Sequence, residues 1–156
     1  MKNLYIASPL GFSELGRLGY KELLSIIKDA GYTYFDPWSV ADQKEIASIL
    51  SMELSPAKQR AWAKLNKVIG ASNVHGIEHC DGIVAVLDGT DVDSGTSSEI
   101  GYGAAKGKPI LGYRGDFRLA CDNEGGIVNL QVEYFITKIV TTLDDLRKAL
   151  PEVFGM

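Results

Sequence analysis

Residues 83–105 limit the folds open to this chain more than any other stretch; they read I-V-A-V-L-D-G-T-D-V-D-S-G-T-S-S-E-I-G-Y-G-A-A. The apolar run at residues 83–87 is rich in β-branched side chains, which predicts a strand buried on both faces. Aspartates and glycines follow and predict a loop, and small residues predict a helix over residues 100–106. Strand, acidic loop and helix form a βα junction, and open α/β sheets bind their ligands at such junctions.

Glu99 in this stretch has two interpretations. In the first, Thr96-x-x-Glu99 is a capping box, in which Thr96 caps the helix and Glu99 reaches back to it. In the second, Glu99 is a reactive carboxylate that the helix N-terminus keeps ionised, as a nucleophile requires. The second is favoured because two glycines weaken the helix and because three aspartates crowd a loop with no lysine or arginine: Asp88, Asp91 and Asp93.

Composition indicates an ordinary globular protein. The 156 residues are 46% hydrophobic and 23% charged, which predicts a single domain over residues 1–156. The formal net charge of -4 argues against a nucleic-acid polymer as partner. No signal peptide or membrane-spanning segment is visible, because the apolar start of the chain is short and broken by Pro9. We therefore expect a cytoplasmic protein that does not bind membranes.

The cysteines and histidines do not predict a metal site. Cys80 and Cys121 lie in different segments, which favours reduced thiols in a cytosol. His75, His79 and Cys80 lack a fourth ligand at a suitable spacing. We expect neither a metal nor a cofactor.

The rest of the chain alternates between strand and helix patterns. Strands are expected at residues 4–7, 32–35, 110–113 and 134–140. Helices are expected at residues 13–30, 39–50, 57–73 and 143–150. The third of these helices should bury Ala61, Leu65, Val68 and Ile69. Between the strands at 110–113 and 134–140, residues 114–126 read as a long loop and 127–131 as a short helix or an extended piece.

This alternation predicts an α/β protein with a doubly wound, mostly parallel five-stranded sheet and helices on both faces. The loops after the first two strands, at residues 8–12 and 36–38, should open on the same edge of the sheet as the acidic loop. G-x-G-x-x-G does not follow the first strand and no P-loop is present, so dinucleotide and P-loop chemistry are disfavoured.

Short motifs spread over most of the chain carry a family resemblance. They are Tyr5-Ile6-Ala7-Ser8-Pro9-Leu10, Asn73 and Ile77 before Asp81, Leu87-Asp88-Gly89, Asp93-x-Gly95-Thr96-x-x-Glu99-x-Gly101-Tyr102, Ala105-x-Gly107-Lys108-Pro109 and Asn129-Leu130. Their combination resembles the nucleoside 2-deoxyribosyltransferase family. The resemblance implies a flavodoxin-like (Rossmann-like) fold and transfer of 2-deoxyribose between purine or pyrimidine bases.

The resemblance also implies roles for single residues. Glu99 matches a nucleophile that attacks C1′ of the sugar and forms a covalent intermediate, so that the configuration is retained. Asp93 matches a carboxylate that binds the sugar hydroxyls, mainly the 5′-OH. Asn129 matches an asparagine that enters a neighbouring subunit's site, which implies a dimer-based oligomer, a hexamer by resemblance. The substrate-binding residues we expect are Tyr5, Ala7, Pro9, Phe12, Asp36, Trp38, Asn73, Asp88, Gly95 and Asn129.

Asn73 departs from the family pattern, because some members carry a proton-donating aspartate at this position. An amide cannot act as a general acid. Either the base leaves with little protonation, or Asp36 serves as the acid; Asp36 reads equally well as a turn residue before Pro37. Trp38 either stacks on the base or packs as a buried aromatic edge.

Two other functions remain open. A related nucleoside or nucleotide N-glycosidase would hydrolyse the same bond, although a 5′-phosphate would be repelled by Asp93. A nucleoside-binding sensor would keep the pocket without turnover, with Glu99 as a capping residue. The sequence leaves open the preference for purines or pyrimidines, the balance between transfer and hydrolysis, and the oligomer size.

Overall fold

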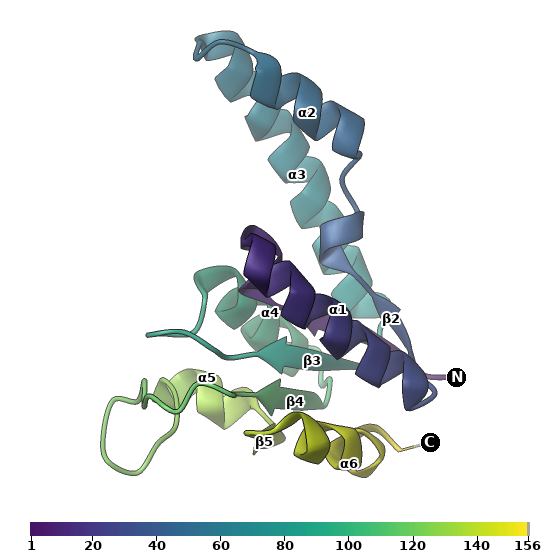
Figure 1. Ribbon diagram of the computed structural model, residues 1–156, viewed down its shortest axis with the longest axis vertical. Coiled ribbons are helices and arrows are strands. Elements are labelled where there is room, and N and C mark those ends of the chain that lie inside the picture. The colour runs from purple at the N-terminus through teal and green to yellow at the C-terminus, as the bar shows by residue number, and fades with distance from the viewer. Residues whose placement is uncertain (156) are drawn as a thin grey trace.

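The computed structural model describes residues 1–155 and contains one sheet of five parallel strands in the order β2-β1-β3-β4-β5 (Figure 1). The strands are β1 Asn3–Ala7, β2 Thr33–Phe35, β3 Gly82–Val86, β4 Ile110–Tyr113 and β5 Lys138–Val140. The helices are α1 Glu14–Asp29, α2 Gln43–Ser51, α3 Pro56–His79, α4 Ser94–Ala105, α5 Leu130–Phe135 and α6 Leu143–Phe154, with short 3-10 turns at Pro9–Phe12 and Pro37–Ser39. This order confirms the predicted flavodoxin-like sheet.

Helices cover both faces of the sheet because side chains alternate along each strand. In β1, Leu4 and Ile6 pack with α1 and α6, whereas Tyr5 and Ala7 pack with α3 and α4. All four side chains are fully buried. The central strand β3 is buried at every position, as its continuous apolar run predicts.

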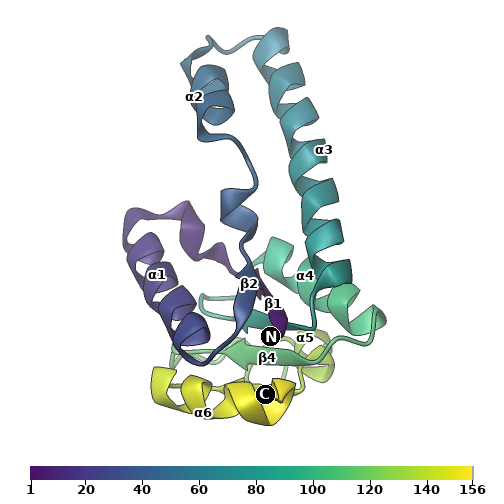
Figure 2. The same cartoon turned by 90° about the vertical axis from the view of Figure 1, so that its right-hand side faces the viewer.

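A helical arm, formed by α2 and the outer half of α3, projects away from the sheet (Figures 1 and 2). Its 24-residue helix α3 is about 36 Å long at 1.5 Å per residue. The prediction that Val68 lies on a buried face of α3 is wrong, since 56% of it is exposed, while Leu65 is buried. The outer half of α3 packs mainly on α2, and this short helix leaves much of the α3 surface exposed to solvent.

Several element boundaries differ from the sequence prediction. Helix α3 runs on to His79, whereas its predicted end is residue 73. Residues 134 and 135 belong to α5, which Asn129 caps, and not to the last strand. Helix α6 continues past Pro151 because its last residue, Phe154, is buried in the core against Gly82. The sequence predicts a short tail after residue 150, and the last residue of that tail, Met156, lies outside the described residues.

Candidate functional site

A cavity of about 810 Å³ opens beside the carboxyl ends of β1, β2 and β3. Strand β1 lies between β2 on one side and β3 on the other, so the order of the strands reverses at β1. Doubly wound sheets bind ligands at such a reversal. The 3-10 turns, helices α1 to α4 and the loop before α4 line it. The lining includes Phe12, Asp36, Trp38, Asn73, Asp93, Gly95 and Glu99. Seven of the predicted site residues therefore share one cavity.

Glu99 is held by hydrogen bonds to one of its two carboxylate oxygens. The Tyr5 hydroxyl donates to Oε1 at 2.6 Å, and Asn73 Nδ2 donates to the same oxygen at 3.4 Å. Tyr5 comes from β1 and Asn73 from α3, so two layers of the fold fix the carboxylate. Within residues 1–155 no hydrogen bond is donated to Oε2, which leaves that oxygen available to a ligand in the cavity.

The pKa of Glu99 is raised to about 7, chiefly because burial disfavours the charged form. The hydrogen bond from Tyr5 lowers the pKa, and the nearby charge of Asp93 raises it. The same carboxylate, in turn, helps burial to raise the pKa of the Tyr5 hydroxyl far above its usual range, so Tyr5 remains a donor. Glu99 is thus poised to change its charge near neutral pH.

The capping-box interpretation of Thr96 and Glu99 is wrong. Helix α4 begins at Ser94, and its N-cap is Asp93, whose Oδ2 accepts bonds from Thr96 N at 3.0 Å and from Thr96 Oγ1 at 3.3 Å. Glu99 therefore lies in the second turn, where it caps nothing. It also lies beyond the first turn, in which the helix dipole acts, so the expectation that the helix N-terminus keeps it ionised fails as well.

Asp36 and Trp38 form the wall opposite α4. Asp36 Oδ1 accepts bonds from the Tyr20 hydroxyl at 2.7 Å and from Trp38 N at 2.9 Å. The Trp38 indole donates to Ser8 O at 3.0 Å and meets the Phe12 ring edge-on, with centroids 4.6 Å apart. Both residues consequently sit in fixed positions on the cavity, with the carboxylate beside the indole.

Gly11 explains how the Trp38 ring fits into this wall. A Cβ atom at Gly11 would lie 2.2 Å from the ring, so only glycine allows the indole to pack on the turn after β1. Tyr20 was missed by the sequence reasoning. It sits on the buried face of α1, where its spacing indicates only a core residue, and its hydroxyl reaches the cavity only through tertiary packing.

Five predicted substrate-binding residues do not line the cavity: Tyr5 is fully buried and touches the site only through its bond to Glu99, and four others lie elsewhere. Ala7 is fully buried in the sheet, and Pro9 forms the first residue of a 3-10 turn without lining the cavity. Asp88 accepts a bond from Asp116 N at 2.9 Å. Asn129 caps α5, its Oδ1 accepting from Gln131 N at 3.0 Å, and does not line the cavity of its own chain. Their functional roles stay predictions.

The charged residues Arg17 and Lys21 also line the cavity and were not predicted. They lie one turn apart on the exposed face of α1, where the sequence indicates only solvated charges. Within residues 1–155, no cluster of three or more histidine, cysteine, aspartate or glutamate side chains could hold a metal ion. In the same range no helix is both long and apolar enough to cross a membrane.

Comparison with known proteins assigns the chain to a family. The family model "Nucleoside 2-deoxyribosyltransferase" matches residues 4–131, and the chain belongs to this family. An uncharacterized protein of Schizosaccharomyces pombe is 30% identical over 122 residues, covering 74% of this chain and 51% of that protein. The chain thus spans about half the length of this curated relative.

Solved structures share the fold. A conserved protein from Enterococcus faecalis V583 has a TM-score of 0.72 at 22% identity, and a 2-desoxiribosyltransferase from Leishmania mexicana has 0.67 at 22% identity; each match covers 97% of this chain and 98% of the other. A CMP N-glycosidase from Clostridium botulinum has a TM-score of 0.54 at 18% identity, again over 97% and 98% of the two chains. The fold therefore accommodates both a transferase and a hydrolase.

Proposed function

We propose that the protein is a nucleoside 2-deoxyribosyltransferase that exchanges nucleobases through a covalent deoxyribosyl intermediate on Glu99. The observation that carries this proposal is the state of the Glu99 carboxylate. Tyr5 and Asn73 bind its Oε1, no group within residues 1–155 donates to Oε2, and Glu99 lines a cavity that is large enough for a nucleoside.

The two half-reactions follow from this geometry. Oε2 attacks C1′ of the sugar, the bond from C1′ to the base nitrogen breaks, and its electron pair leaves with the base, which takes up a proton. A second base then attacks C1′ through a ring nitrogen from the face that the first base left and gives up the proton of that nitrogen to solvent, while the bond from C1′ to Oε2 breaks and its electron pair returns to the Glu99 carboxylate. Charge develops on the sugar in both steps, and the buried carboxylate stabilises it.

Asp93 supports a nucleoside over a nucleotide as substrate. Its carboxylate lines the cavity near Glu99 and contributes to the raised pKa of that residue. A carboxylate accepts hydrogen bonds from sugar hydroxyls but repels a phosphate. We assign Asp93 to the sugar hydroxyls and the wall formed by Asp36 and Trp38 to the base.

A base-exchange assay tests the proposal. Thymidine or deoxyinosine is incubated with and without free adenine or cytosine, and the products are separated by chromatography. We expect a new deoxynucleoside that forms only with the acceptor base and is lost in Glu99→Ala. Free base released at the same rate without an acceptor would contradict transfer.

Hydrolysis is a second candidate, and one observation favours it. Asn129 does not line the cavity of its own chain, so a single subunit lacks the asparagine that the family resemblance places in the site, and we expect such a site to admit water. Transfer therefore goes with an oligomer in which a neighbouring Asn129 closes the site. Release of base from nucleosides or nucleotides by a monomer would establish the hydrolase instead.

A further inference from the structure

Arg114 directly follows β4 and is the largest fully buried side chain of the protein, with 2% exposure. Its backbone N donates to Val140 O at 2.8 Å and so extends the sheet by one residue. No carboxylate among residues 1–155 forms an ion pair with its guanidinium. A buried cation without a counter-charge is costly, and its retention calls for an explanation beyond packing.

The guanidinium instead donates to three backbone carbonyls. Nη1 bonds Leu87 O, and Nη2 bonds Gly89 O at 3.1 Å and Arg118 O at 2.5 Å. Nε is buried and has no hydrogen-bond partner within residues 1–155. Two of the three carbonyls belong to the end of β3 and the turn after it, so Arg114 joins the loop after β4 to the acidic loop before α4.

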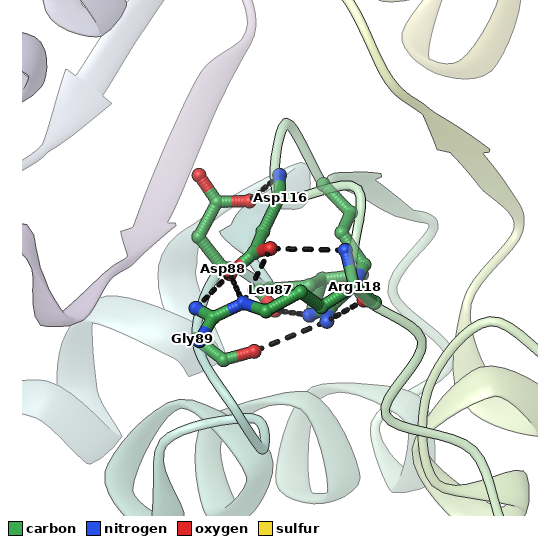
Figure 3. Close-up of polar contacts among 6 residues, drawn as sticks. Leu87, Asp88, Gly89, Asp116 and Arg118 are labelled. Atoms are coloured by element: carbon green, nitrogen blue, oxygen red, sulfur yellow. Dashed lines mark hydrogen bonds and ion pairs between the residues drawn. The ribbon is translucent and has the colours of Figure 1, made fainter.

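One further bond joins the same two segments, and an ion pair within the second segment holds Asp116 in place (Figure 3). Asp88 Oδ1 accepts from Asp116 N at 2.9 Å, and the Asp116 carboxylate pairs with the Arg118 guanidinium, whose Nε lies 2.9 Å from Oδ1. The ion pair holds the pKa of Asp116 well below its usual range. Residues 87–89 and 114–118 thus form one connected unit.

This unit contains the start of the acidic loop. Gly89 has a φ of 129°, and a Cβ there would lie 2.9 Å from Asp91 O, so the turn depends on glycine and on its bonded carbonyl. Four residues later the chain reaches Asp93, which caps α4 and faces Glu99. A shift of the turn would move Asp93 and the start of α4 together.

We propose that Arg114 is a positioning residue: its guanidinium sets the path of residues 88–93 and thereby the placement of Asp93 against Glu99. The inference deepens the proposed function. Only the part of its test that measures catalysis depends on that function. An apolar side chain could fill the same space but would leave the carbonyls of Leu87 and Gly89 without donors. A lysine would bring a single donor centre instead of a planar fork that spans separate carbonyls.

The test compares Arg114→Met and Arg114→Lys with the wild type. The first readout is the titration midpoint of the Glu99 carboxyl, followed by 13C NMR of glutamate-labelled protein and assigned with Glu99→Gln. The titratable groups that act on Glu99 are Tyr5 from β1, Tyr20 from α1 and Asp93 from the loop before α4. The second readout is steady-state base exchange.

We expect the Arg114→Met midpoint to fall from about 7 toward the ordinary value of 4.5, since a displaced loop admits water and moves Asp93 away. We expect kcat to fall by about 100-fold, as a displacement of the site by about 1 Å can produce, with a smaller change in KM. The midpoint and the kcat of Arg114→Lys should lie between those of the wild type and those of Arg114→Met. Arg147→Met removes an exposed arginine of α6 and should keep the wild-type midpoint and rate.

An unchanged midpoint in folded Arg114→Met overturns the inference, even if the protein is less stable, because Arg114 would then be only structural. If Arg114→Met does not fold, Arg114→Lys decides: a wild-type midpoint and a wild-type rate overturn the inference. Should the wild type exchange no base while the midpoint still shifts in the variants, the proposed function fails and the positioning role of Arg114 stands.

Discussion

In the proposed mechanism, Glu99 must meet two opposing requirements at the scale of a single residue. A carboxylate attacks C1′ best when it is stripped of water, yet burial also favours the protonated form that cannot attack. The bond from Tyr5 partly resolves the conflict by stabilising the charged form, but the pKa still lies at about 7. The protein therefore holds a carboxylate that is only partly ionised at neutral pH, and this affects stability as well as rate.

The first prediction concerns the stability of Glu99→Gln. Between pH 4.5 and about 7 the folded state holds a proton that the unfolded state releases, so the free energy of unfolding falls as pH rises through this window. Glutamine does not ionise. At pH 8 we expect Glu99→Gln to be more stable than the wild type by on the order of 2–3 kcal/mol, and the difference to vanish near pH 4.

Urea unfolding at pH 4, 6 and 8 measures this difference. Glu22→Gln serves as the control, because Glu22 is an exposed residue with only a surface ion pair to Arg147. It should change stability by no more than about 1 kcal/mol at any of the three pH values, as expected of an exposed ion pair. A stability difference for Glu99→Gln that stays constant from pH 4 to 8 would mean that Glu99 titrates normally.

The second prediction concerns Asn73, whose Oδ1 is buried without a partner while its Nδ2 donates to Glu99. The amide has no proton to give to the departing base, so wild-type rates should depend steeply on how stable the base anion is. In Asn73→Asp the neighbouring carboxylate favours protonation of the new aspartate, which then acts as an acid. We expect thymidine to react at least about 10-fold faster in this variant, given that general acids contribute 10²–10⁴-fold.

The measurement compares thymidine with 5-fluoro-2′-deoxyuridine, whose base leaves more easily. The wild type should react much faster with the fluorinated substrate than with thymidine. In Asn73→Asp the ratio of these two rates should be smaller. Asn73→Ala, which removes the amide without adding an acid, should leave the ratio wide. An equal ratio in wild type and Asn73→Asp would show that another group, with Asp36 as the candidate, already protonates the base.

At the scale of the element, two of the three glycines of helix α4, Gly101 and Gly103, have different surroundings. A Cβ at Gly103 would lie 2.2 Å from Ile83 Cδ1, so α4 packs on β3 as closely as glycine allows. A Cβ at Gly101 would meet only Phe135, at 3.8 Å. Helix propensity favours alanine at both positions, but packing opposes it at Gly103 alone.

The third prediction uses this pair. Gly101→Ala should stabilise the protein by about 0.5–1 kcal/mol through helix propensity. Gly103→Ala should destabilise it by about 1–3 kcal/mol, because overpacking forces α4 away from the sheet. Thermal unfolding of both variants checks the signs. If both variants are more stable than the wild type, Ile83 can move aside at no cost in free energy, and the packing of α4 on β3 does not require glycine at position 103.

The sequence predicted those elements whose signals are local. The apolar run of β3 and the glycine and aspartate loop after it placed Glu99 correctly at a βα junction. The N-cap was misplaced on Thr96 because Asp93 and Thr96 are both good caps, and only the fold selects between them. The hydrogen bond between Tyr20 and Asp36 was not predictable, since it joins α1 to the end of β2 through tertiary packing.

For the whole molecule, the arrangement of cavity and arm bears on how the site is closed. The arm contributes Gln43, Ile46, Asn66 and Ile69 to one side of the cavity. Apolar side chains elsewhere on the arm remain exposed, with Leu50 at 60% and Leu54 at 87%. A single chain therefore leaves both the arm and the site partly uncovered, which a second subunit can remedy if Asn129 enters the neighbouring site.

The fourth prediction tests this assembly by mixing two inactive variants, Glu99→Gln and Asn129→Ser. Serine keeps the N-cap of α5, so the second variant loses the amide rather than the helix. When each site combines Glu99 from one chain with Asn129 from another, a co-expressed equal mixture should regain about a quarter of wild-type exchange, by random pairing of chains. A mixture of Glu99→Gln with Glu99→Ala should regain nothing. Full activity of Asn129→Ser alone, or a fully active monomer in sedimentation, would place the complete site within one chain and remove the reason for transfer to need an oligomer.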